Sequence, residues 1–166
     1  RDRRMAALAA IIKLSPAVPF PGSSFVPEAL EFFAATRGSR RVLVAAPASE
    51  AATGLTGYLV PLGYEVDSVL TGRDALAKLI ASPDYEMVFL DARLSTPEPG
   101  LLIQQLRRDG RTARLPVGVF SGEGQHERAR RAVRDDPLAV AFPRPYAPDT
   151  AQWAIAQVAG LSLIHI

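Results

Sequence analysis

The sequence contains no cysteine and only two histidines among its 166 residues. The absence of cysteine excludes disulfide bridges, cysteine-ligated zinc, iron–sulfur clusters and thiol nucleophiles. Two histidines, one of them the penultimate residue, are too few for a cluster of imidazole ligands. Most metal and thiol chemistry is therefore excluded.

Long apolar runs and a strong charge imbalance are also lacking. No apolar run approaches the ~18 residues that a membrane span needs, so we expect no membrane insertion. The 19 basic residues exceed the 17 acidic residues by only two, which is too small an excess to indicate nucleic-acid binding. A hydrophobic fraction of 48% against 22% charged residues predicts a soluble globular protein of one domain with a small appendage.

Both ends of the chain differ from its middle. Apolar residues at helical spacing predict one helix over residues 2 to 14 and a second over residues 27 to 36, with a proline-rich loop over residues 15 to 24 between them. Two short helices cannot bury their apolar faces alone, so we interpret residues 1 to 38 as a helical segment or the end of a helical repeat. Residues 161 to 166 are an apolar run without a polar face, and we interpret them as a non-native tail.

Strand and helix patterns alternate between residues 40 and 160. Strands are predicted over residues 42 to 46, 64 to 70, 87 to 90, 116 to 120 and 138 to 142, and helices over residues 49 to 62, 72 to 80, 102 to 106, 125 to 134 and 148 to 158. A capping box at Thr71 opens the second of these helices, and Trp153 in the last is predicted to lie in the core. Apolar strands joined by crossover helices predict an α/β fold with a doubly wound parallel sheet.

Ligands and chemistry in such a fold lie at the carboxyl ends of the strands. Ala46 and Pro47 follow the first predicted strand, Asp91 ends the third, Ser121 ends the fourth and Arg144 follows the fifth. These are the candidate functional residues. Ser121 has a second interpretation as the N-cap of the helix that follows it.

An acid after the third strand, a hydroxyl after the fourth and a long basic residue before a proline after the fifth resemble the response-regulator receiver domain. The resemblance rests on residues 41 to 47, 63 to 66, 87 to 91, 116 to 121 and 142 to 146. It implies a flavodoxin-like, five-stranded parallel sheet of strand order 2-1-3-4-5. It also implies that Asp91 is the phosphoacceptor equivalent, Ser121 the switch-hydroxyl equivalent and Arg144 the equivalent of the family's lysine.

The same resemblance implies the setting in which the protein works. It implies phosphorelay signal transduction in a two-component system, located in the cytoplasm. The partners would be a histidine kinase, a phosphotransfer protein or an output domain of the same chain, and a homodimer is an alternative assembly.

The sequence departs from the receiver pattern at the metal site. In the family an acidic pair joins the acceptor aspartate in holding Mg²⁺, whereas Ala46 and Pro47 stand at those positions here. We therefore expect no cofactor, and Mg²⁺ only if a displaced carboxylate such as Glu50 completes the site. We also expect no catalytic residues and no enzymatic activity. Arg144 in place of lysine suggests a standing ion pair with Asp91, and the alternative is an arginine that faces solvent.

Two further departures concern the switch and the acceptor. The family's switch aromatic falls at Ala141, with Phe142 on the opposite face of the strand. Asp91 has a purely structural alternative as an anchor for the loop that follows it. We therefore predict a degenerate, pseudo-receiver-like regulatory or binding module that is not phosphorylated in the usual Mg²⁺-dependent way. A working phosphoacceptor at Asp91 and a small-molecule-binding doubly wound domain stay open as alternatives.

Arginines gather in the helix predicted over residues 125 to 134. Arg128 and Arg131 share one face of this helix, and acidic residues interrupt the run. Such a pattern is typical of a solvated face of mixed charge. Its functional interpretation is a surface for an acidic protein partner. No aromatic residues are interleaved, so we expect no nucleic acid there.

Overall fold

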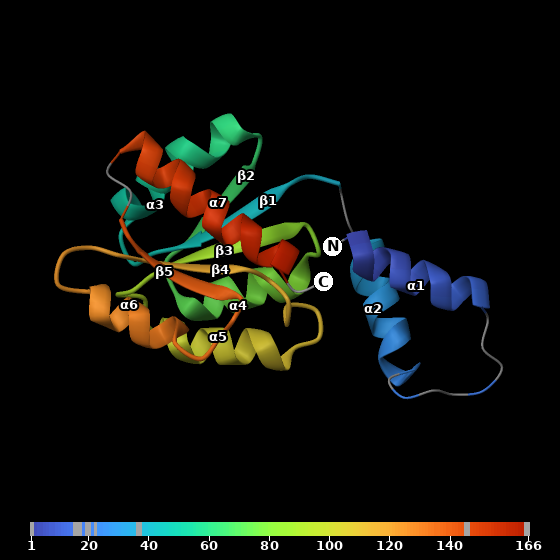
Figure 1. The fold of residues 1–166 in the computed structure, drawn as a ribbon. Coiled ribbons are helices and arrows are strands. Elements are labelled where there is room, and N and C mark those ends of the chain that lie inside the picture. Colours follow the sequence, from blue (N-terminus) through green and yellow to red (C-terminus); the bar gives the residue numbers. More distant parts are fainter. Residues whose placement is uncertain are drawn as a thin grey trace.

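The computed structural model describes residues 2–14, 18, 21, 23–35, 38–144 and 147–164. Its main body is a five-stranded parallel sheet of strand order β2-β1-β3-β4-β5, with helices on both faces (Figure 1). The predicted doubly wound, flavodoxin-like fold is therefore confirmed. Some predictions fall outside the described residues: most of the loop over 15 to 24, the end of the second helix at Thr36, positions 145 and 146, and the last two residues of the predicted tail.

The strands differ in burial according to their place in the sheet. They are β1 (Arg41–Ala45), β2 (Glu65–Val69), β3 (Tyr85–Asp91), β4 (Val117–Ser121) and β5 (Ala139–Pro143). The three central strands are almost wholly buried because helices cover both faces. The edge strand β2 carries the charged residues Glu65 and Asp67, as a strand with one free edge can.

Two separate cores lie on the two faces of the sheet. The helices are α3 (Ser49–Leu59), α4 (Gly72–Ala81), α5 (Pro99–Arg108), α6 (His126–Val133) and α7 (Pro148–Ile164). Helices α3 and α7 cover one core, in which Phe89 and Phe142 meet edge to face at 5.9 Å between ring centroids. Helices α4, α5 and α6 cover the other, which includes Leu90 and Leu106. Each such side chain contributes roughly 1.5 to 3 kcal/mol by its burial.

The predicted helix over residues 49 to 62 is shorter than expected. Helix α3 ends at Leu59, and a 3-10 turn, η2 (Val60–Leu62), follows it. Pro61 has no N–H to continue the α-helical ladder, and Gly63 takes a φ of 83°, which ends the turn. The cap at the next helix is confirmed, because the side chain of Thr71 accepts a hydrogen bond from the amide of Asp74 at 3.2 Å.

The placement of Trp153 in the core is wrong. Trp153 is 52% exposed, because α7 presents small and aliphatic residues to the sheet, among them Ala151, Ala154 and Val158. Trp153 comes one position before Ala154 and so falls on the solvent side of the helix. Helix α7 also continues to Ile164, beyond its predicted end near residue 158.

The amino-terminal segment forms a helical pair. It contains α1 (Asp2–Leu14), η1 (Ser23–Phe25) and α2 (Val26–Ala34), and α1 packs against α2 (Figure 1). Among the side chains described in α1 and α2, none is fully buried. Glu28 of α2 lies 3.7 Å from Arg111, in the turn after α5. In the part of the chain that the structure describes, no helix has the length and apolarity to cross a membrane.

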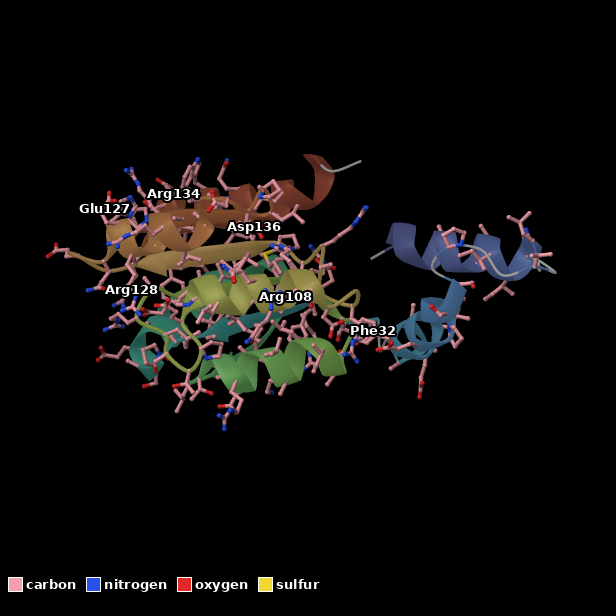
Figure 2. All side chains as sticks on the ribbon, turned by 90° about the horizontal axis from the view of Figure 1, so that it is seen from below. Phe32, Arg108, Glu127, Arg128, Arg134 and Asp136 are labelled. Carbon is pink, nitrogen blue, oxygen red and sulfur yellow. The ribbon has the colours of Figure 1, made fainter. Side chains whose placement is uncertain are left out.

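Arg107, near the end of α5, ties together the loops at the amino ends of β4 and β5. Its Nε and Nη2 donate to the two carboxylate oxygens of Asp136 at 2.7 and 3.1 Å. Its Nη1 donates to the carbonyl oxygen of Leu115 at 2.8 Å. The neighbouring Arg108 is exposed (Figure 2). Arg107 therefore acts as a clamp between three chain segments, whereas Arg108 is a surface residue.

We expect Arg107→Ala to lower the free energy of unfolding by about 2 to 3 kcal/mol, because it removes the cation that pairs with Asp136 and the donor to the carbonyl oxygen of Leu115, leaving Asp136 only the amide of Leu138 as a donor. The matched control Arg108→Ala, one residue away on the same helix, is expected to change it by less than about 0.5 kcal/mol. Urea unfolding followed by circular dichroism measures both values. Equal losses in the two variants would contradict the clamp.

Candidate functional site

The carboxyl ends of β3, β4 and β5 bring three of the predicted residues together. The register pairs the end of β3 with β4 and the end of β4 with β5. Asp91, Ser121 and Arg144 therefore meet at one edge of the sheet, where the amide of Arg144 donates to the carbonyl oxygen of Ser121 at 2.7 Å. Ala46 follows β1 and is fully buried, while Pro47 is exposed.

The carboxylate of Asp91 is completely buried, and Arg93 holds both of its oxygens. Nε of Arg93 lies 3.1 Å from Oδ1, and Nη2 lies 2.9 Å from Oδ2. The backbone amide of Arg93 also donates to Oδ1, at 2.8 Å. We call this arrangement the Asp91–Arg93 fork. Because the amide of Leu94 also donates to the carbonyl oxygen of Asp91 at 2.9 Å, Asp91 does anchor the loop that follows it.

Arg144 makes the ion pair with Asp91 that its sequence position suggests. Its Nη2 lies 3.3 Å from Oδ2, so the predicted contact is confirmed. The contact is single rather than bidentate, because Arg93 already engages both oxygens. Nε of Arg144 is buried and has no hydrogen-bond partner. Arg144 is thus the second and less fully engaged cation at Asp91.

Sequence reasoning missed Arg93, although a signal for it exists. An aspartate two residues before an arginine occurs three times: once at the start of the amino-terminal helix, at Asp2 and Arg4, and twice after it, at Asp91 with Arg93 and at Asp109 with Arg111. There too the backbone amide donates to Oδ1, at 2.9 Å, and the guanidinium Nε and Nη2 reach Oδ1 and Oδ2 at 3.0 and 2.7 Å. The turn that follows Asp91 and Asp109 folds the arginine back over the carboxylate. The spacing could therefore have identified Arg93 as a ligand of Asp91.

The electrostatics of the site follow from this geometry. Burial by itself raises the pKa of Asp91, but hydrogen bonds from the side chain and amide of Arg93, with the charges of Arg93 and Arg144, bring the pKa below its ordinary value. The hydrogen bond to Asp91 in turn raises the pKa of Arg93. The pair is therefore fully charged at neutral pH.

The residues at this edge do not fit Mg²⁺. The ion requires octahedral oxygen ligands with at least one or two carboxylates. Ala46 offers a methyl group, Pro47 has no side-chain oxygen, and guanidinium groups occupy both oxygens of Asp91. Glu50 is exposed in the first turn of α3. Within the described residues, no three histidine, aspartate or glutamate side chains gather into a set that could hold a metal ion.

Ser121 is the last residue of β4 and does not cap the next helix. The N-cap of α6 is Gln125, because the turn formed by residues 122 to 125 separates the strand from the helix. The Ser121 hydroxyl is buried, 3.2 Å from Nδ1 of His126 and 3.5 Å from the carbonyl oxygen of Phe142. The N-cap interpretation is therefore wrong.

The two residues at the switch-aromatic region lie on opposite faces of β5, as predicted. Ala141 packs against the core under α4, α5 and α6. Phe142 belongs to the other core and contacts Phe89 and Phe120. No aromatic ring of β5 is therefore placed beside Ser121 on the face that Ala141 occupies.

The predicted partner surface on α6 is exposed. Arg128 and Arg131 both face solvent, and Figure 2 shows Glu127 and Arg128 on α6, with Arg134 just after its end. Arg128 lies 3.4 Å from Glu98. Exposed pairs of this kind contribute at most about 1 kcal/mol. The face is therefore one of mixed charge, and its role toward a partner stays a prediction.

The lowered pKa of Asp91 predicts how stability responds to acid. A carboxylate with a lower pKa in the folded than in the unfolded state adds stability above its unfolded pKa of about 3.9, and loses it as pH falls through the folded value. We expect Asp91→Asn to be less stable than the wild type at pH 7, with the difference shrinking between pH 5 and pH 3. Urea unfolding across this range measures it, with Glu123→Gln, an exposed carboxylate of the next loop, as the control. A difference that is constant with pH would contradict the geometry of the site.

Comparison with known proteins places the fold. No model of a known protein family matches the sequence, and neither does any curated protein. A receiver domain of a Clostridium thermocellum response regulator superposes with a TM-score of 0.64 at 15% identity, covering 76% of this chain and 98% of that one. The receiver domain of NtrX from Brucella abortus superposes with a TM-score of 0.62 at 22% identity, and the match covers 71% of this chain and 97% of that one. The chemotaxis response regulator CheY4 of Vibrio cholerae superposes with a TM-score of 0.60 at 17% identity, and the match covers 72% of this chain and 98% of that one. Most of the chain therefore has the fold of a response-regulator receiver domain.

Proposed function

We propose that the receiver-like body, residues 40 to 160, is a regulatory or binding module of a two-component signalling protein. In this proposal the module is not an enzyme, needs no cofactor and works in the cytoplasm. Asp91 is not phosphorylated by the usual Mg²⁺-dependent route and serves as a permanent ion-pair partner instead. The fold of the solved receiver domains supports the signalling role.

The occupation of the Asp91 carboxylate is the observation that carries the proposal. Oδ1 accepts hydrogen bonds from the amide and Nε of Arg93, and Oδ2 accepts them from Nη2 of Arg93 and Nη2 of Arg144. A carboxylate has about four acceptor positions, so all of them are in use. Attack on a phosphoryl group needs a free carboxylate oxygen and a cation that offsets the charge on the transferred group. No oxygen of Asp91 is free while both arginines are bound, and Ala46 and Pro47 offer no side-chain ligand for Mg²⁺.

The partners follow by analogy with a longer structure. A structure of NtrX from Brucella abortus matches 75% of this chain but only 28% of its own length, so in that protein the same fold is one part of a larger chain. We propose that the module here acts on an output domain of the same chain, a histidine kinase or a phosphotransfer protein, or pairs with a second copy. Arg128 and Arg131 are the proposed contact residues for an acidic partner surface, because they are exposed on α6.

Intact-mass spectrometry tests the state of Asp91. The purified protein is incubated with Mg²⁺ and a small phosphodonor, next to a receiver domain that retains the acidic pair. We expect the mass of this protein to stay unchanged while the comparison domain gains one phosphoryl group, because both Asp91 oxygens are engaged and the metal ligands are missing.

Asp91→Ala is the control for the site of modification. A hydroxylamine-labile mass increase in the wild type that disappears in Asp91→Ala would establish a working phosphoacceptor and refute the proposal. A ligand-dependent rise in melting temperature that is unaffected by Asp91→Ala would instead favour a small-molecule-binding domain.

A further inference from the structure

The Asp91 site carries an excess of positive charge. Two guanidinium groups, at +1 each, meet one carboxylate, at −1, which leaves a formal +1. Asp91 is completely buried, whereas the side chains of Arg93 and Arg144 are 42% and 27% exposed. Among the described residues, the ion pairs of both arginines are with Asp91 alone. The positive charge that remains therefore lies on the solvent side of the carboxylate.

Both arginines also have donors to spare. Arg93 uses its amide, Nε and Nη2, and Arg144 uses only Nη2 among its side-chain nitrogens. Within the described part of the chain, Nη1 of each arginine makes no hydrogen bond, and the buried Nε of Arg144 has no partner. A guanidinium that makes one contact of 3.3 Å and keeps a buried N–H without an acceptor gains from any added acceptor it can reach. The site therefore offers donors without acceptors.

Gly122, in the turn that follows β4, lies close to the guanidinium of Arg144. A Cβ atom added to Gly122 would meet only Nη2 of Arg144, at 4.0 Å. Among the described residues, no other side chain packs into this position. An incoming group could therefore approach Arg144 from the turn that follows β4.

The second fork in the molecule lacks these properties. Asp109 and Arg111 have the same local geometry, but among the described residues Asp109 has no ion pair with a second arginine. Arg111 also lies 3.7 Å from the carboxylate of Glu28. The excess of positive charge is therefore specific to the Asp91 site and does not follow from the local motif.

We propose that Arg93 and Arg144 together bind a small oxyanion of the phosphate class, without covalent attachment, beside Asp91. Guanidinium groups match the tetrahedral oxygens of phosphate with paired N–H donors, and two of them from different loops define a site rather than a single contact. The inference rests on the proposed function in one respect, since Asp91 must be held by the arginines. A free phosphate and a phosphate monoester share this chemistry.

Nuclear magnetic resonance titration of the ¹⁵N-labelled protein tests the site directly. Sodium phosphate is added at pH 7, and sodium chloride at matched ionic strength is the parallel arm. We expect saturable shifts of the Arg93, Gly122 and Arg144 signals with phosphate only. A phosphate monoester in a third arm shows whether the bound group must be free or can be part of a larger molecule. Shifts that fail to saturate, or that chloride reproduces, would overturn the inference.

Variants assign the binding to the two arginines. Arg93→Gln and Arg144→Gln are each expected to weaken phosphate binding by about tenfold or more, because each removes charge-assisted hydrogen bonds. Arg111→Gln, which alters the matched fork, is expected to leave binding unchanged. Binding that survives both of the first two substitutions would overturn the inference.

Asp91→Asn separates this inference from phosphorylation of Asp91. Removing the negative charge is expected to tighten non-covalent phosphate binding, by about tenfold, because the same two arginines then face the ligand without a competing carboxylate. Loss of the phosphate-dependent shifts in Asp91→Asn would overturn the inference. If phosphate fails to bind while the mass stays unchanged with a phosphodonor, only this inference fails. If Asp91 gains a phosphoryl group, the proposed function fails whatever the titration shows.

Discussion

A carboxylate without solvent exposure at the end of a central strand needs a cation beside it. Moving an unpaired carboxylate out of water costs far more than any single contact returns, so the charge must be matched where it is buried. In this chain the matching cation is the guanidinium of Arg93, two residues along from Asp91 and bound to both of its oxygens. A cation built into the chain is always present and is held in place by the same turn that places the aspartate. The chemistry at this edge of the sheet depends on Arg93 being the cation that pairs with Asp91.

The fork also fixes the path of the chain around the site. The loop after Asp91 connects β3 to α5 and passes the start of α4. There the carbonyl oxygens of Ser95 and Thr96 accept hydrogen bonds from the amides of Gly72 and Arg73, at 3.2 and 2.8 Å. These amides belong to the first turn of α4 and have no partner within their own helix. The approach is so close that a Cβ atom on Gly72 would collide with the backbone of residue 97. Only glycine fits there, and the aspartate, its loop and the start of α4 therefore form one connected unit.

The sequence predicts the strands and helices, because these depend on the periodicity of apolar residues. It does not predict side-chain positions that depend on the path of a local turn. Apolar strands and their order could be predicted because a buried strand must be apolar on both faces, and Ala46 could be recognised as unable to bind a metal from its residue type alone. Arg93 was missed because its role depends on how the chain turns after Asp91, which apolar periodicity does not report. Ser121 was misassigned because four residues of turn separate it from α6, and Trp153 because a large aromatic residue was assumed to be buried.

The relation between the two arginines follows from the number of acceptor positions on one carboxylate. Three of about four positions accept from Arg93, which is close in sequence and loses little chain entropy in reaching them. Arg144 follows a different strand, β5, and receives the position that is left, at the longest distance of the set. It therefore contributes less to holding Asp91 than its charge suggests, and no described residue accepts a hydrogen bond from its other side-chain donors. A lysine at this position could not divide its charge in this way, because an ammonium group is a single point of charge without a second edge. The exchange of lysine for arginine thus matters here for the donors it leaves unused.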